Sequence, residues 1–211
     1  MIIVLTGGIG SGKSEVCSIL AENYGFHIYE ADSKVKELYI SHPSLLSDIE
    51  TALGANCRTE NGVFQPALLA ELIFRDKDSL QKVESLVFPA LSEDFDKWMA
   101  DQNDGLPVVF ESATVLEKTY FDGFGDMNVL VNAPFDLRLS RAVERDGDRN
   151  RVKSRMTLQN LMNRLSEGFV DERIDFVIDN SGTLDDLKSR IHDFVSHIAC
   201  NKNVVSAQQR C

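Results

Sequence analysis

The residues best suited to chemistry lie in a glycine-rich segment near the start of the chain. Residues 7–14 read Gly-Gly-Ile-Gly-Ser-Gly-Lys-Ser, with an apolar run before them and a helical pattern after them. A glycine, four free positions and then Gly-Lys-Ser form a phosphate-binding loop when they connect a strand to a helix. Because both flanking elements are expected here, we interpret the segment as such a loop rather than as a plain glycine turn.

Each residue type in this segment has a part in phosphate chemistry. Glycines lack a Cβ, so successive backbone N–H groups can curl around phosphate oxygens, and the helix that follows adds the positive end of its dipole. Lys13 would neutralise the outer phosphates, and the Ser14 hydroxyl would be one ligand of Mg²⁺. The expected ATP-binding residues of this segment are Gly8, Gly10, Ser11, Gly12, Lys13, Ser14 and Glu15.

Acidic residues follow two of the expected strands. The strand over residues 26–29 leads into Glu30 and Asp32, and the strand over residues 107–110 leads into Glu111. In an open α/β sheet such positions face the crevice where ligands bind. Asp32 is therefore a candidate to accept a proton from a substrate hydroxyl or to hold the metal through water. An equally good interpretation makes Asp32 the N-cap of a helix over residues 33–40.

A basic segment is the second chemical signal. Residues 138–155 contain seven arginines or lysines and three acidic residues. Arg138, Arg141 and Arg145 share one helix face, and Gly147 then interrupts the pattern, which predicts a helix leading into a mobile hairpin. A closing lid could use such arginines to neutralise a transferring phosphoryl group and exclude water. A solvated, salt-bridged face is the common alternative for one arginine, but the loop favours catalysis for Arg141 and Arg145.

The remaining pattern predicts an α/β fold with a helical insertion. Short apolar strands, the later ones near residues 107–110, 129–131 and 176–178, alternate with helices, which is typical of a parallel sheet covered on both faces. We expect a nucleotide-binding core over residues 1–40 and 105–200, with a lid at 138–157. Residues 41–104 form the insertion, where an acceptor could be enclosed. A closing helix is expected over 183–199 and a flexible tail over 201–211.

Composition narrows the class of ligand. A net charge of -11 argues against general nucleic-acid binding and for a small ligand held by a local basic patch. No apolar run reaches membrane-spanning length, and Met1 leads directly into a strand, so we expect a cytoplasmic protein without membrane attachment. The four cysteines are scattered and are interpreted as free thiols, and the histidines do not have metal-site spacing.

Several segments together resemble the dephospho-CoA kinase family, from about residue 2 to residue 198. They are residues 5–14, 30–32, 72–74, 86–89 and 141–146, then Gln159 and residues 177–180, in that order. The resemblance implies a P-loop kinase with a five-stranded parallel sheet, a helical acceptor-binding insertion and an arginine-bearing lid. It also implies transfer of the ATP γ-phosphoryl group to the ribose 3'-hydroxyl of dephospho-CoA, the last step of coenzyme A synthesis, with Mg²⁺.

The resemblance also implies site residues. Asp32 matches the family's catalytic aspartate, the proposed general base, and Arg141 matches a phosphate-binding arginine of the lid. Asn180 falls in the motif beside the adenine of ATP. We therefore expect Asp32, Lys13 and Arg141 to be catalytic, and Arg145 and Asn180 to join the loop in binding ATP.

Three departures from the family pattern concern the acceptor side. Glu30 replaces an aspartate, Phe88 replaces a histidine, and residues 113–117 have lost the family's proline. Two other interpretations remain at this stage. One is another small-molecule P-loop kinase, of the nucleoside monophosphate type, and the other is a non-catalytic ATP-binding protein of the same fold. A GTPase is disfavoured because no Asn-Lys-x-Asp follows a late strand. We expect a monomer or a weak homo-oligomer.

Overall fold

The structure is a computed structural model that describes residues 1–208, except for the side chains of residues 74, 75 and 201–208. The chain divides into two compact units. The first contains Met1–Ile28 and the chain from Leu106 onward, and the second contains Tyr29–Gly105. No helix in the described residues is both long and apolar enough to cross a membrane.

The chain forms a five-stranded parallel sheet, as predicted, and the phosphate-binding loop over residues 7–14 follows its first strand. The strands run in the order β2-β3-β1-β4-β5. In the register, Leu5 of β1 lies opposite Glu111 of β3 and Val129 of β4, so the ends of these strands lie at one edge. The strand bounds are β1 Ile2–Thr6, β2 His27–Glu30, β3 Val108–Glu111, β4 Met127–Asn132 and β5 Phe176–Asp179.

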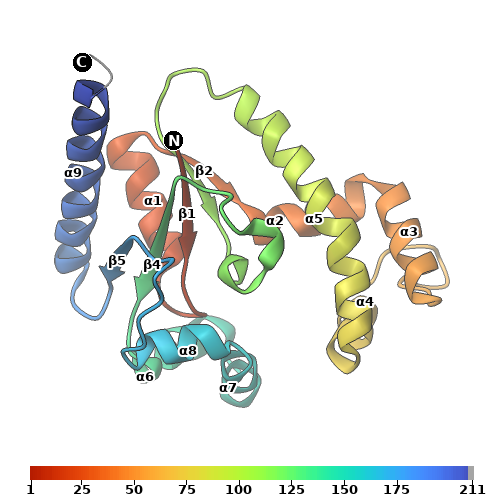
Figure 1. The fold of residues 1–211 in the computed structure, drawn as a ribbon. Helices are drawn as coiled ribbons and strands as arrows, with labels where there is room; N and C mark the ends of the chain where they lie inside the picture. The colour runs from red at the N-terminus through yellow and green to blue at the C-terminus, as the bar shows by residue number, and fades with distance from the viewer. Residues whose placement is uncertain (209–211) are drawn as a thin grey trace. The chain divides into compact units, whose positions relative to one another are not determined.

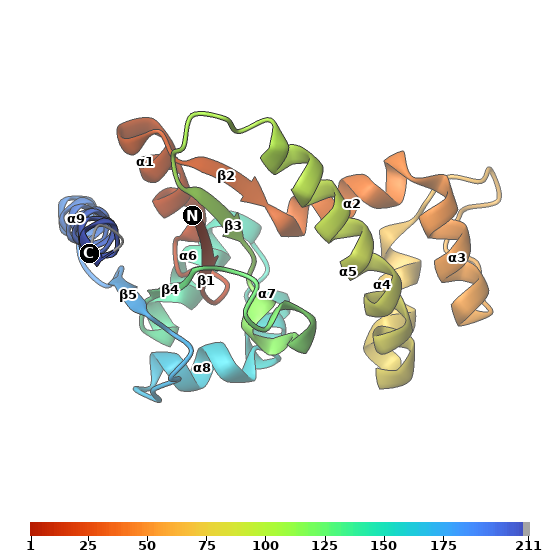
Figure 2. The same ribbon diagram turned by 45° about the horizontal axis from the view of Figure 1, so that its top comes forward.

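Helices α1 (Lys13–Tyr24) and α9 (Leu184–Gln208) pack together beside this sheet (Figures 1 and 2). Apolar residues of the strands and of both helices form the core, because continuous apolar strands need cover. Its members include Ile3, Leu5, Val16, Leu20, Val129, Val131, Ile191 and Phe194. Gly25, at a φ of 72°, ends α1 and turns the chain into β2. The core thus fixes the strand and the helix on either side of the loop.

Three further helices gather beyond the carboxyl ends of the strands in the first unit (Figure 1). They are α6 (Phe135–Asp146), α7 (Arg149–Thr157) and α8 (Asn160–Ser166). The predicted hairpin after Gly147 is wrong, because this segment is helix α7. Asp148 caps that helix by accepting a hydrogen bond from the Arg151 N–H at 3.0 Å. Two short 3₁₀ turns, η1 (Val115–Glu117) and η2 (Thr119–Phe121), lie between β3 and β4.

Helix α9 also differs from its predicted extent. It runs to Gln208, past the expected end at Ala199, so residues 201–208 of the expected tail are helical in the backbone. Residues 209–211 of that tail lie outside the described residues.

The second unit is helical. Its members are α2 (Ala31–Ser41), α3 (Pro43–Leu53), α4 (Pro66–Arg75) and α5 (Lys77–Ala100). Pro43 and Pro66 stand in the first turns of their helices, where a missing N–H costs nothing. This unit begins at Tyr29 rather than at residue 41, because α2 packs against α3 and α5.

Candidate functional site

The loop between β1 and α1 is a closed turn that leads directly into the helix. The Ser11 N–H donates to the Gly8 carbonyl at 3.0 Å, and the Val16 N–H donates to the Gly12 carbonyl at 3.1 Å. Gly12 is the N-cap residue of α1, in the left-handed region at a φ of 95°, and no side chain caps the helix. Because the first N–H groups of a helix lack intrahelical acceptors, this helix end is suited to an anion.

Three of the loop glycines are closely packed against other parts of the protein, and at Gly10 the neighbouring atoms are backbone. A Cβ on Gly8 would overlap the Arg138 guanidinium, and one on Gly10 would overlap the Arg138 backbone carbonyl. A Cβ on Gly12 would overlap the Asn180 side-chain amide. The sequence analysis assigned these glycines to phosphate contact alone, whereas the structure shows that other parts of the first unit also pack closely against them.

Side chains from distant parts of the chain hold the loop in place. The Asn180 Nδ2 donates to the Ser11 carbonyl at 2.8 Å, and Arg141 Nη1 donates to the Asn180 carbonyl at 2.9 Å. The Ile9 N–H donates to Gln159 Oε1 at 2.8 Å. Asn180 and Gln159 are both buried. The structure therefore brings Arg141 and Asn180, two predicted site residues, together with the loop.

Lys13 is held at the same edge of the sheet. Its Nζ donates to the Gly7 carbonyl at 3.0 Å and lies 3.4 Å from Glu111 Oε1. Each of the two charged side chains is only 12% exposed. Sequence reasoning noted Glu111 as an acid after a strand but gave it no role. The pairing of Lys13 with Glu111 depends on the register of β1 and β3, which sequence alone did not provide.

The arginines of α6 lie at three different depths. Arg138 is 1% exposed, so its assignment to a surface patch is wrong. Arg141 is half-buried, whereas the side chain of Arg145 is 63% exposed. Arg145 Nε and Nη2 donate to the two carboxylate oxygens of Asp146 at 2.7 and 3.0 Å. These hydrogen bonds hold the pKa of Asp146 below its usual value, and Arg155 adds a weaker contact at 3.4 Å.

The other predicted residues lie at the starts of helices. Ser14 and Glu15 are exposed in the first turn of α1. Asp32 is exposed in the first turn of α2 and belongs to the second unit. It is not an N-cap, because α2 begins at Ala31 and Glu30 occupies the cap position. Asp32 thus lies inside the first turn of the helix and not at its cap.

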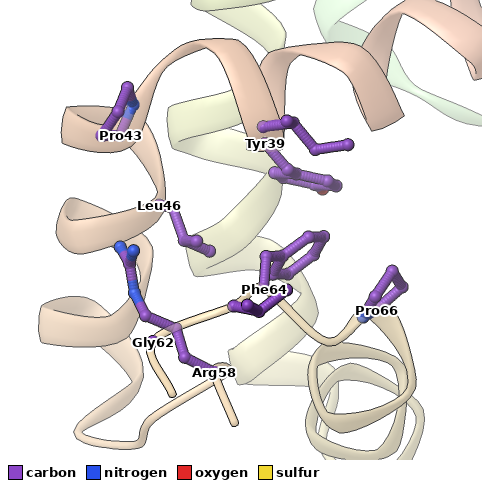
Figure 3. Close-up of a pocket in the computed structure, with 9 residues that line it drawn as sticks. Tyr39, Pro43, Leu46, Arg58, Gly62, Phe64 and Pro66 are labelled. Atoms are coloured by element: carbon purple, nitrogen blue, oxygen red, sulfur yellow. The ribbon is translucent and has the colours of Figure 1, made fainter.

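The second unit contains a pocket of about 400 Å³ (Figure 3). Tyr39, Leu46 and Phe64 point toward one another in it, and the Tyr39 and Phe64 rings are 5.2 Å apart between centroids. Burial raises the pKa of Tyr39 to about 12. The pocket is lined by Tyr39, Ile40, Pro43, Leu46, Arg58, Gly62, Val63, Phe64 and Pro66. It is largely apolar, and the guanidinium of its charged lining residue, Arg58, pairs with Glu50 at 3.1 Å.

Known proteins resemble this chain over nearly its whole length. The family model described as dephospho-CoA kinase matches residues 1–186. A dephospho-CoA kinase of Fusobacterium nucleatum is 30% identical over 198 residues, covering 94% of this chain and 98% of the relative. The solved structure of TT1252 from Thermus thermophilus has a TM-score of 0.77 and 25% identity, covering 93% of this chain and 97% of that one.

A second solved structure shares the fold at lower identity. Dephospho-CoA kinase from Campylobacter jejuni has a TM-score of 0.63 and 19% identity, and the match covers 95% of this chain and 98% of that chain. The family match spans the phosphate-binding loop, Asp32, the arginines of α6 and Asn180. On these grounds the chain belongs to the dephospho-CoA kinase family.

Proposed function

We propose that this kinase transfers the γ-phosphoryl group of ATP to the ribose 3'-hydroxyl of dephospho-CoA, giving CoA and ADP. The observation that carries the proposal is the anchored loop over residues 7–14, with Lys13 fixed at its edge, in a chain that the family model matches over residues 1–186. No finding favours a nucleoside monophosphate acceptor or a non-catalytic role.

The loop residues fit the phosphates of ATP. The uncapped start of α1 presents N–H groups to an anion, and Ser11 Oγ and Thr6 Oγ1 are buried polar atoms without a hydrogen-bond partner among the described residues. Phosphoryl transfer needs little covalent help, so positioning and charge neutralisation supply most of the catalysis. The Lys13 ammonium group would neutralise the negative charge of the phosphoryl group during its transfer. Glu111 would hold this ammonium group at the loop.

The oxygen ligands near the loop also fit a Mg²⁺ ion that binds together with the nucleotide. The described residues contain no group of three acidic, cysteine or histidine side chains that could hold a metal ion by themselves. Mg²⁺ commonly takes one or two protein ligands together with substrate phosphates and waters, and the Ser14 hydroxyl would be the protein ligand here. When bound, the ion supplies positive charge to the phosphate oxygens.

The arginines of α6 would complete the charge neutralisation. Arg141 is already fixed beside the loop through Asn180, so it requires little rearrangement to meet a phosphate. Arg145 is exposed and would exchange its contact with Asp146 for a phosphate oxygen. This division of roles agrees with the lid over residues 138–157 that we propose from the sequence.

The second unit would present the acceptor. Asp32 stands exposed at the start of α2, and its carboxylate would take the proton from the 3'-hydroxyl. The apolar pocket beside Tyr39 and Phe64 suits the aliphatic part of the pantetheine arm, with Arg58 and Tyr39 as hydrogen-bonding groups.

The decisive experiment measures ADP production by the purified protein with ATP and Mg²⁺. Dephospho-CoA, AMP and adenosine are compared as acceptors, and the nucleotide product is identified by its mass. Strong stimulation by dephospho-CoA alone, with CoA as the product, is the expected result. Stimulation by AMP or adenosine, or the same rate without any acceptor, would contradict the proposal.

A further inference from the structure

Arg138 is a buried cation on α6 that the proposed mechanism does not use. It is among the largest fully buried side chains, with 1% of its surface exposed. Its Nη2 donates to Asn163 Oδ1 at 2.8 Å and lies 3.5 Å from Ser166 Oγ. The Phe135 ring centroid lies 5.6 Å from the guanidinium carbon. All of these partners are neutral.

Two donor atoms of this guanidinium have no partner among the described residues. Nε and Nη1 are buried and make no hydrogen bond to any described residue. No carboxylate in the described part of the chain forms an ion pair with Arg138, and burial alone lowers the pKa of its guanidinium. A buried charge without a counter-charge is costly, because desolvation is not offset by attraction to a partner. Within the described residues, the guanidinium is therefore a buried positive charge without a paired negative charge.

The charge lies directly against the phosphate-binding loop. A Cβ built on Gly8 would lie 2.8 Å from the guanidinium carbon of Arg138 and would overlap its Nη1. The backbone of Arg138 is packed just as closely against Gly10. The unpartnered Nη1 is thus adjacent to the loop itself. A charge in this place interacts with an anion in the loop through protein rather than through water. Salt screens such a buried interaction only weakly.

We propose that Arg138 is a built-in counter-charge for the nucleotide phosphates, a positioning residue that acts through the loop without touching the substrate. The inference rests on the proposed binding of ATP in that loop. It explains why an arginine without a counter-ion is kept in the interior of the first unit: its charge is complemented when the polyphosphate arrives. Arg138 differs in this from Arg141 and Arg145, whose guanidinium groups have oxygen partners in the nucleotide-free protein.

The test compares Arg138→Met and Arg138→Gln with wild type in binding and in unfolding. Both remove the charge, and Gln keeps a donor for Asn163. We expect the Kd of ATP to rise about tenfold or more, that of ADP less, and that of adenosine to stay unchanged, because the lost attraction follows phosphate charge. The difference should persist at high salt. The thermal midpoint of the nucleotide-free protein should stay equal or rise, since an unpaired buried charge is gone.

Two controls separate charge from packing. Arg138→Lys keeps the charge and should bind ATP more tightly than Arg138→Gln. Leu139→Met changes a neighbouring buried side chain without altering charge and should bind ATP as the wild type does. The inference is overturned if Arg138→Gln binds ATP with wild-type affinity. It is also overturned if both charge-removing variants unfold at a lower temperature and lose affinity for adenosine and ATP alike. Failure of the wild-type protein to bind ATP would instead contradict the proposed function.

Discussion

Arg141 is hydrogen-bonded to the backbone of Asn180, with Nη1 2.9 Å from the carbonyl oxygen, and the side chain of Asn180 holds the Ser11 carbonyl in turn. Helix α6, the end of β5 and the phosphate-binding loop are therefore connected by hydrogen bonds within the protein itself. This hydrogen bond fixes the guanidinium through Nη1. Because the guanidinium is planar, the bond also sets the orientation of its remaining N–H donors. A flexible lysine could not keep the same geometry.

Replacing Arg141 by Lys should therefore impair catalysis although the charge is retained. We expect kcat/KM to fall about a hundredfold or more, since an arginine that stabilises a phosphoryl-transfer transition state is worth roughly 10³–10⁵ in rate. Steady-state kinetics with ATP and dephospho-CoA measures the loss. Arg190→Lys, at an exposed position of α9, serves as the matched control and should behave as wild type. Equal kinetics for Arg141→Lys and wild type would exclude Arg141 from the transition state.

Replacing Asp32 by Asn should separate catalysis from binding. The variant keeps the shape of the side chain and stands at an exposed position, so it should fold normally. Turnover should fall by about 10²–10⁴, the range for loss of a general base, with nearly unchanged ATP affinity. Glu30→Gln, which alters the neighbouring exposed carboxylate, should lose far less. If Asp32→Asn keeps wild-type turnover, the general-base assignment fails.

Replacing Asn180 by Ala should weaken both the fold and the loop. The substitution leaves the Ser11 carbonyl without its buried donor, which should lower the free energy of unfolding by about 1–3 kcal/mol and raise the Kd of ATP. Chemical denaturation and nucleotide titration measure the two effects. Asn128→Ala removes an exposed bond to the Arg173 carbonyl and should cost less stability, without any change in ATP binding. Unchanged ATP affinity in Asn180→Ala would show that the loop does not need this support.

Replacing Phe64 by Ala tests the pocket of the second unit. If the pocket holds part of the acceptor, the KM for dephospho-CoA should rise about tenfold, in line with the loss of a buried aromatic contact, while the KM for ATP stays constant. Val170→Ala, at a position 79% exposed in the first unit, is the control. A rise in the KM for ATP, or no change in either KM, would argue against an acceptor pocket here.

The loop and the sheet could be predicted because their signals are local. The residues of the loop, the apolar strand before it and the helix after it are adjacent in sequence, and each strand shows a short apolar run. Helical spacing likewise placed the arginines of α6 on one face. Spacing does not give depth, however, and the burial of Arg138 follows from α8 and the loop, which pack against it from elsewhere in the chain.

The errors had other physical causes. Gly147 ended a helical pattern and suggested a hairpin, but Asp148 supplies a cap that starts α7 at once. The second unit begins at Tyr29, whereas the sequence predicted an insertion that begins at residue 41. Helix α2 follows β2 directly in sequence, but it packs against α3 and α5. Glu111 was visible as an acid after a strand, but its partner Lys13 could be identified only through the register of β1 and β3.

The bond from Asn180 to Ser11 spans 169 positions of the chain. During synthesis on the ribosome the loop is made well before the residue that supports it. A nascent chain that does not yet contain β5 has the phosphate-binding loop but lacks Asn180, which supports the loop. The anchored form of the loop therefore requires that β5 has been made, and ATP would preferentially stabilise chains that include β5 over shorter ones.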